Sequence, residues 1–226
     1  EDGLAALDVS GRLVLAHNPA KAPRAEVLEN ARRAGALMAE RLAAAKRPEA
    51  QLVGLHEDAE LLLALAEGLA LGAYSFRKFK TGKAPVGPER VRLVHPDIDR
   101  RAVERLNDLV ASVCTVRDLV NEPVSSLNAV QLASELRTLC RNAQVKFQVL
   151  DKAQIEALGM GGLLAVNKGS VDPPTFSILE YKPKKAVNTK PIVLVGKGVV
   201  YDTGGLSLKP TPNSMDQMKC DMAGAA

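Results

Sequence analysis

The chain has 226 residues, 46% of them hydrophobic and 25% charged, which is ordinary for a globular protein with one large domain or two small ones. No stretch approaches the roughly 18 consecutive apolar residues of a membrane-spanning helix, so we expect no membrane association. The net charge is only +4 and tryptophan is absent, which argues against a nucleic-acid platform of stacked aromatic side chains.

Residues 1–96 alternate strand-like and helix-like patterns. Apolar runs predict strands at 12–16, 51–55 and 91–94, and apolar residues at helical spacing predict helices at 24–45 and 58–74. A segment with Gly and Pro at 81–88 is predicted as a loop. This alternation favours an α/β domain over residues 1–96, which we expect to be incomplete at its start because the chain does not begin with Met.

A long amphipathic segment at 97–122 follows this domain. Its apolar residues recur at intervals of three and four, which predicts a single helix. Asp97 or Asp99 can cap the start of this helix, and Pro123 ends it. A helix of this length, with different material on each side, is predicted to connect two domains.

A second alternation of helix and strand patterns occupies residues 123–226. Asn128 and Asp151 are each placed to cap a helix, and Gly159 can terminate the second of these. Strands are predicted at 145–149, 163–166, 175–181 and 192–195, the last being a continuous apolar run typical of a buried central strand. The chain is therefore predicted to be an α/β protein with two domains joined by a helix.

Four charged residues gather in a glycine-rich setting after the last predicted strand. Lys197, Asp202 and Lys209 follow its carboxyl end, where open α/β sheets bind ligands, and Asp221 arrives from the next segment. A phosphate-binding loop is disfavoured, because no GxxxxGK[ST] string exists and Tyr201 stands where a dinucleotide fingerprint needs glycine. A structural turn, in which the lysines simply pair with the aspartates, is a second interpretation.

A carboxylate-rich metal site is the third interpretation. Aspartate oxygens suit Mg, Mn or Zn, and a carboxylate that bridges two such ions forms a hydrolytic site. A lysine can join the ligands only as the neutral amine, which requires the metal to lower its pKa strongly. A second lysine that keeps its proton can stabilise a developing oxyanion.

The residues at 196–226, GKGVVYDTGGLSLKPTPNSMDQMKCDMAGAA, resemble the M17 leucyl aminopeptidase family, whose pattern is roughly GKGxxFDxGGxSxK…MDxMxxDMxGAA. VRDLVNEP at 116–123, GMGGLLAVNKGS at 159–170 and Asp172-Pro173-Pro174 are similar to the same family. This resemblance implies a macro-like N-terminal α/β domain at 1–96, a connecting helix at 97–122 and the first part of a zinc-peptidase-like catalytic domain at 123–226.

The resemblance also implies roles for single residues. Lys197, Asp202 and Asp221 would be ligands of two divalent metal ions, Mn or Zn before Mg or Co, with Asp202 bridging them. Lys209 would be the catalytic lysine at the scissile carbonyl oxygen, and Met218 would line the pocket for the first side chain of the substrate. A further family motif, roughly NTDAEGR, supplies two carboxylate ligands and an arginine that holds a bicarbonate ion. This motif is absent from the sequence, so we expect the complete protein to extend further.

The function that the resemblance implies is a metal-dependent leucyl aminopeptidase, which hydrolyses the N-terminal residue from peptides, typically as a cytoplasmic homohexamer. Three widely spaced cysteines, an odd number, independently favour reduced thiols and a cytoplasmic location. Two alternatives stay open. One is a DNA-binding or regulatory relative that would use basic clusters such as Arg77 to Lys83, and the other is an inactive structural paralogue.

Overall fold

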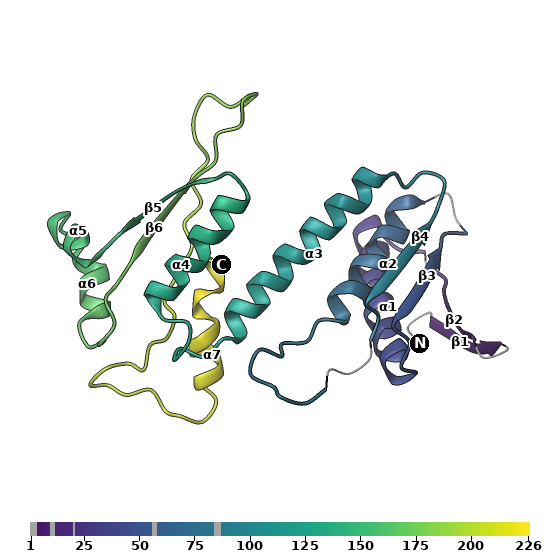
Figure 1. The fold of residues 1–226 in the computed structure, drawn as a ribbon, viewed down its shortest axis with the longest axis horizontal. Helices are drawn as coiled ribbons and strands as arrows, with labels where there is room; N and C mark the ends of the chain where they lie inside the picture. Colours follow the sequence, from purple (N-terminus) through teal and green to yellow (C-terminus); the bar gives the residue numbers. More distant parts are fainter. Residues whose placement is uncertain (1–3, 10–11, 20, 56–57, 84–86) are drawn as a thin grey trace. The chain divides into compact units, whose positions relative to one another are not determined.

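The computed structural model describes residues 4–9, 12–19, 21–55, 58–83 and 87–226, which belong to two compact units, Glu1–Cys114 and Thr115–Ala226 (Figure 1). The division falls within the long helix α3 (Arg100–Asn121), so this helix contributes its last turns to the second unit. Asp99 caps α3 by accepting a hydrogen bond from the amide of Ala102, as predicted. Within the described residues, no helix combines the length and the apolar character that crossing a membrane requires.

The first unit contains a β-hairpin, a pair of parallel strands and two helices. Its elements are β1 (Leu4–Val9), β2 (Arg12–His17), α1 (Arg24–Ala44), β3 (Glu49–Val53), α2 (Ala59–Gly72) and β4 (Arg90–Val94). β1 pairs antiparallel with β2, and β3 pairs in parallel with β4. Both predicted helices are confirmed, as are the three strands, although β3 begins two residues before its predicted start. β1 was not predicted, because its Leu- and Ala-rich sequence favours a helix over a strand.

Helices α1 and α2 pack so closely that their backbones meet at two glycines. A methyl group added at Gly68 would lie 1.9 Å from the carbonyl oxygen of Arg32, and one added at Gly35 would lie 2.1 Å from that of Leu65. Around this contact lies an apolar core from both helices and β3, formed by Met38, Ala39, Leu42, Leu52, Leu62, Ala66 and Leu69. The absence of side chains at the two glycines therefore sets the distance between the helices.

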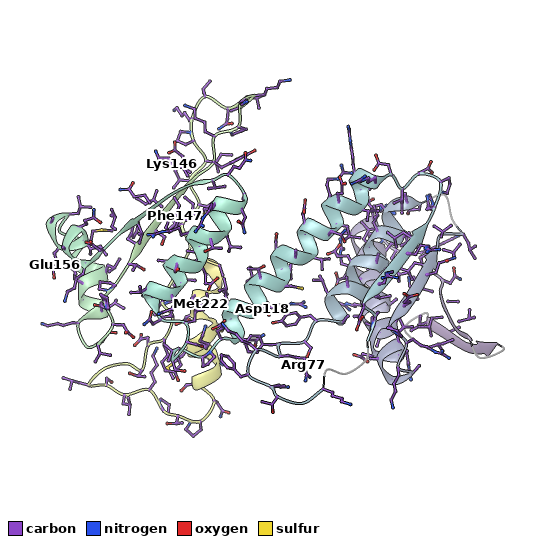
Figure 2. All side chains as sticks on the ribbon, viewed as in Figure 1. Arg77, Asp118, Lys146, Phe147, Glu156 and Met222 are labelled. Carbon is purple, nitrogen blue, oxygen red and sulfur yellow. The ribbon has the colours of Figure 1, made fainter. Side chains whose placement is uncertain are left out.

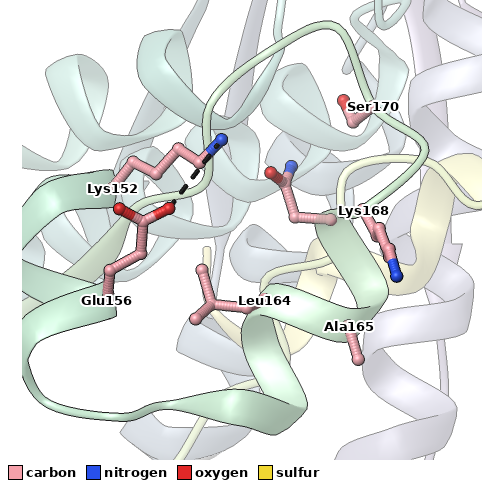
Figure 3. A pocket seen from close by; sticks show the side chains of 7 residues that line it. Lys152, Glu156, Leu164, Ala165, Lys168 and Ser170 are labelled. Carbon is pink, nitrogen blue, oxygen red and sulfur yellow. Dashed lines mark ion pairs between the residues drawn. The ribbon is translucent and has the colours of Figure 1, made fainter.

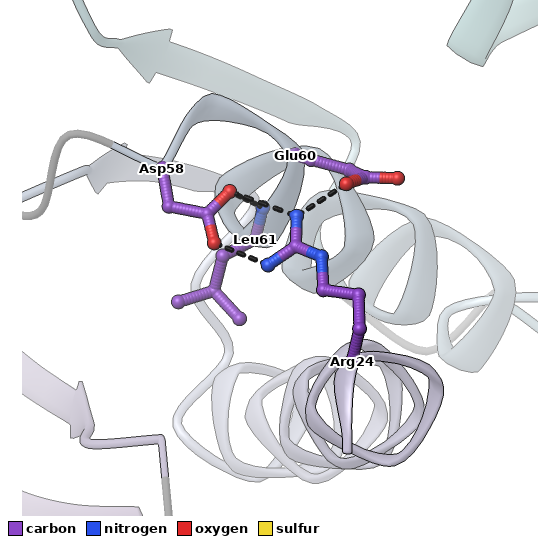
Figure 4. A network of polar contacts seen from close by, with 4 residues as sticks. All are labelled: Arg24, Asp58, Glu60 and Leu61. Atoms are coloured by element: carbon purple, nitrogen blue, oxygen red, sulfur yellow. Dashed lines mark hydrogen bonds and ion pairs between the residues drawn. The ribbon is translucent and has the colours of Figure 1, made fainter. Parts of the chain in front are cut away.

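A polar network joins the start of α1 to the start of α2 (Figure 4). The guanidinium of Arg24 contacts the carboxylates of Asp58 and Glu60, and its Nη2 donates to Asp58 Oδ1 at 3.0 Å. Asp58 also caps α2, because its Oδ1 accepts a hydrogen bond from the amide of Leu61 at 3.2 Å. The hydrogen bond from Arg24, followed by the one from Leu61, lowers the pKa of Asp58 below its usual range.

The second unit adds helices and one pair of strands to the end of α3. Its elements are α4 (Ala129–Asn142), β5 (Lys146–Leu150), α5 (Lys152–Ala157), α6 (Gly161–Asn167), β6 (Phe176–Glu180), α7 (Met215–Cys220) and a 3-10 turn (Asp221–Gly224). β5 and β6 pair antiparallel, with Lys146 opposite Glu180. Both predicted caps are confirmed: Asn128 accepts from two amides of α4, and Asp151 forms a capping box with Gln154.

The core of the second unit gathers around the turn that follows α7. It consists of Leu119, Leu127, Leu132, Leu136 and Met222. Met222 lies in that turn and is fully buried (Figure 2). Since Leu119 belongs to α3 and Leu132 and Leu136 belong to α4, the turn is fastened to both of these helices by apolar packing.

Two predicted strands of the second unit are wrong. Residues 163–166 lie in helix α6, because Leu and Ala favour helix and a run of four apolar residues carries no period that separates strand from helix. Residues 192–195 form no strand and expose 75% to 93% of their surface. A strand requires a neighbour for its backbone groups, and in the described part of the chain β5 and β6 pair only with each other.

The α/β class predicted from the sequence is confirmed, since both units combine helices with strands. The three domain limits, 1–96, 97–122 and 123–226, stay predictions.

Gly68→Ala is expected to destabilise the first unit by about 1–3 kcal/mol, because its methyl group would meet the backbone of α1. That clash outweighs the roughly 0.5–1 kcal/mol by which Ala is normally favoured over Gly in a helix. Urea unfolding followed by circular dichroism measures the change. Gly82→Ala is the control, since an added methyl group there has nothing within 4 Å. Equal unfolding midpoints for the two variants would contradict the close helix contact.

Asp58→Ala is expected to cost about 1 kcal/mol of stability through loss of the α2 cap, and Asp58→Asn less, because its amide oxygen can still cap. Since the folded pKa of Asp58 is lowered, its ionic contribution is complete above the ordinary aspartate pKa of about 4. It is lost as the pH falls through the folded pKa. Stability measured between pH 3 and pH 7 should therefore depend less on pH in Asp58→Asn than in the unaltered protein.

Candidate functional site

The candidate site forms where the loop after residue 195 crosses the 3-10 turn Asp221–Gly224. The contact is made by backbone alone, because a methyl group added at Gly196 would lie 2.2 Å from the carbonyl oxygen of Gly224. This close approach brings the next residue of the loop, Lys197, beside the first residue of the turn, Asp221. The Nζ of Lys197 lies 3.7 Å from Oδ2 of Asp221.

A second ion pair lies further along the same loop. The Nζ of Lys209 is 3.2 Å from Oδ2 of Asp202, and the amide of Gly204 donates to Oδ1 of Asp202 at 2.8 Å. The backbone amide of Lys209 donates to the carbonyl oxygen of Thr203 at 2.9 Å, which closes the loop between the paired residues. The loop therefore holds Asp202 by its own backbone as well as by the lysine.

The two ion pairs act on each other electrostatically. The pKa of Asp202 lies below its usual range, first because of the hydrogen bond from Gly204 and then because of Lys209. The positive charge of Lys197 lowers this pKa further. The four predicted residues therefore form a cluster of two ion pairs, which are linked through the charge of Lys197 acting on Asp202.

The cluster is open to solvent. The four paired side chains expose between 35% and 60% of their surface. Among the residues that the structure describes, no group of three or more His, Cys, Asp or Glu side chains could hold a metal ion. Asp202, Asp221 and the amine of Lys197 suit divalent cations in donor chemistry, but two carboxylates are fewer than a complete two-metal centre needs.

Met218 differs from the other predicted site residues, because only 6% of it is exposed. It lies on α7, one turn before Asp221, and its amide donates to the carbonyl oxygen of Ser214. A Met buried at this position serves mainly in packing, and it can contact a ligand only if a pocket extends to its side chain.

Sequence reasoning missed a polar contact beneath the site. Nζ of Lys219 donates to the carbonyl oxygen of Leu119 at 2.9 Å. Burial lowers the pKa of Lys219, while the negative charge of Glu122, itself only 8% exposed, opposes this shift. The available signal was Pro123: it has no N–H, so the carbonyl of Leu119, four residues earlier, lacks its usual helical donor.

A separate open cavity of about 450 Å³ lies between α5 and α6 (Figure 3). It is lined by Lys152, Glu156, Leu164, Ala165, Asn167, Lys168 and Ser170. Lys152 faces Glu156 at 4.0 Å, so these two charges compensate each other. None of the candidate site residues lines this cavity.

The basic cluster of the first unit is partly used within its own loop. Arg77 donates to the carbonyl oxygens of Gly82 and Lys83, at 2.7 Å and 3.0 Å. Lys78 lies over the ring of Phe79 at 5.9 Å from its centroid. These contacts explain the cluster as part of the loop and do not favour a DNA-binding surface.

A family model described as the catalytic domain of the cytosol aminopeptidase family matches residues 114–226. A protein named "Probable cytosol aminopeptidase" from Chlorobaculum tepidum is 44% identical over 180 residues, covering 74% of this chain and 35% of its own length. The solved structure of the bottromycin maturation enzyme BotP in complex with Mn is 31% identical, with a TM-score of 0.79, and covers 99% of this chain and 48% of its own.

The cytosol aminopeptidase from Coxiella burnetii has the same fold, with a TM-score of 0.78 at 24% identity, over 99% of this chain and 45% of its own. The chain thus spans about a third of the length of the curated relatives it matches. The mixed α/β fold of both units is therefore one that solved aminopeptidase structures share.

Gly196→Ala is expected to destabilise the second unit by about 1–3 kcal/mol, because its methyl group would collide with the backbone of Gly224. Gly198→Ala is the matched control, since its methyl group would make an ordinary contact at 3.5 Å with the side chain of Ala225. Thermal unfolding of both variants compares the two effects. A Gly196→Ala protein as stable as Gly198→Ala would show that the loop and the turn do not meet as described.

Proposed function

This chain belongs to the cytosol aminopeptidase family, and on that premise we propose that the full-length protein is a metal-dependent leucyl aminopeptidase that removes the N-terminal residue of peptides. The observation that carries this proposal is the meeting of Lys197, Asp202, Lys209 and Asp221 in one accessible cluster. Charged groups that only stabilise a turn need no second carboxylate from a distant segment, whereas a hydrolytic centre does.

Lys197, Asp202 and Asp221 are the proposed ligands of two divalent ions, with Asp202 shared between them and Lys197 binding as the neutral amine. Their donor chemistry supports this, because carboxylate oxygens are the ligands that hard divalent cations prefer. The similarity to BotP, solved with Mn, favours Mn, and Zn is the second choice. Ions bound there would supply Lewis-acid activation of water and of the peptide carbonyl.

Lys209 is the proposed catalytic lysine. Its ammonium is held near the cluster by Asp202 and exposes more than a third of its side chain, so it can turn toward a peptide carbonyl. There its charge would stabilise the oxyanion that develops when water attacks. Met218, on the same helix that leads to Asp221, is proposed to contact the first side chain of the substrate.

The remaining proposals concern the full-length protein. They are a peptide substrate with a free N-terminus, further carboxylate ligands and an arginine-bound bicarbonate from outside this segment, a homohexameric assembly and a cytoplasmic location. The names of the curated relatives support the substrate class and the location.

The proposal is tested by hydrolysis of leucine p-nitroanilide by the full-length protein, with Mn²⁺ or Zn²⁺ and after chelation. Lys209→Met is expected to lower kcat by about 100-fold to 1000-fold with little change in KM, because it removes one oxyanion donor. Asp202→Asn is expected to abolish the metal-dependent activity, because it removes the shared ligand.

Two exposed residues provide matched controls for these substitutions, Lys184→Met and Asp108→Asn, and both should retain full activity. Wild-type protein without activity toward any aminoacyl substrate and metal would refute the aminopeptidase proposal. Full activity in Asp202→Asn or Lys209→Met would refute the role given to that residue.

A further inference from the structure

A hydrogen bond joins α7 to the end of α3, across 100 residues of sequence. Nζ of Lys219 donates to the carbonyl oxygen of Leu119 at 2.9 Å. In an uninterrupted helix this carbonyl would accept from the amide of residue 123, but residue 123 is proline and has no N–H. The lysine therefore supplies the donor that the helix itself cannot.

The surroundings of this contact favour a positively charged donor side chain. The last carbonyl groups of α3 carry the negative end of the helix dipole, which favours a positive charge. Glu122, one residue past the helix and buried, attracts the charge of Lys219. A neutral side chain of the same length would leave the carbonyl of Leu119 without its donor and the Glu122 carboxylate without the lysine charge.

The position of Lys219 connects this contact to the candidate site. Asp221 follows two residues later, at the point where α7 passes into the 3-10 turn. The next residue, Met222, is fully buried in the core that also contains Leu119. The backbone around Asp221 is thus held to α3 both by the ammonium of Lys219 and by the side chain of Met222.

We propose that Lys219 is a positioning residue for Asp221: by binding the open carbonyl at the end of α3, it holds this carboxylate in the geometry that a metal ion requires. The inference rests on the proposed function, since it takes Asp221 as a metal ligand. Lys219 itself binds neither metal nor substrate, and it acts only through the backbone of α7.

The test is calorimetric titration of the metal-free, full-length protein with Mn²⁺ in the absence of substrate. Lys219→Met is expected to weaken Mn²⁺ binding by about tenfold, as loss of a group that orients a ligand does. Lys219→Arg should restore most of the affinity, because arginine also carries a charge and N–H donors. Lys184→Met, on an exposed loop, is the control and should bind Mn²⁺ like the wild type.

Hydrogen exchange of the peptide that covers residues 215–224, measured without metal, is the second readout. Lys219→Met should exchange faster there than the wild type or Lys219→Arg. If Lys219→Met does not fold, Glu122→Gln replaces it, and weaker Mn²⁺ binding is again expected.

Unchanged Mn²⁺ affinity in Lys219→Met would overturn the proposal, even if hydrogen exchange at 215–224 were faster. The hydrogen bond from Lys219 to Leu119 would then contribute to stability alone. Weakened affinity that arginine does not restore would overturn it as well. Wild-type protein that binds no Mn²⁺ would instead refute the proposed metal centre itself, so the two failures can be distinguished.

Discussion

The candidate site depends on one steric constraint, the backbone contact between Gly196 and the turn Asp221–Gly224. Because Gly196 carries no side chain, two segments more than twenty residues apart can approach within van der Waals distance. Two charged residues near this contact, Lys197 and Asp221, then lie side by side. A larger residue at Gly196 would separate the carboxylate of the turn from the loop that carries the other three charges.

Electrostatics explains how such a cluster remains stable and yet available. Two carboxylates and two ammonium groups compensate each other, so the cluster carries no net charge. Exposed ion pairs of this kind contribute only about 0–1 kcal/mol each, so a divalent ion can replace a lysine at little cost. Meanwhile Asp202 keeps a lowered pKa through the amide of Gly204, a backbone contact that need not break when Lys209 moves away. These weak pairings leave both carboxylates accessible to a cation.

The parts of the fold that the sequence predicted well are those decided by local chemistry. Asp99, Asn128 and Asp151 cap helices through amides two or three residues away, so their roles can be recognised from neighbouring residues alone. The errors at 163–166 and 192–195 concern apolar runs whose structure depends on what lies beside them, which spacing cannot reveal. The site residues were identified through a long motif rather than through any periodicity, and their pairing partners became visible only in three dimensions.

The hydrogen bond from Lys219 to the carbonyl oxygen of Leu119 shows why one class of contact cannot be predicted from sequence. Pro123 is normally interpreted as the end of a helix, and this interpretation is correct here. However, the same proline also leaves the carbonyl of Leu119 without a donor, and such a group is usually satisfied elsewhere when it lies near a core. The sequence indicates that the carbonyl of Leu119 needs a donor, but it does not indicate which polar group of the chain provides one. Only folding, which buries Met222 and Leu119 in the same core, brings Lys219 within 2.9 Å of that oxygen. The carbonyl group that α3 leaves without a helical donor therefore binds α7 through Lys219. This lysine lies two residues before Asp221, a proposed metal ligand.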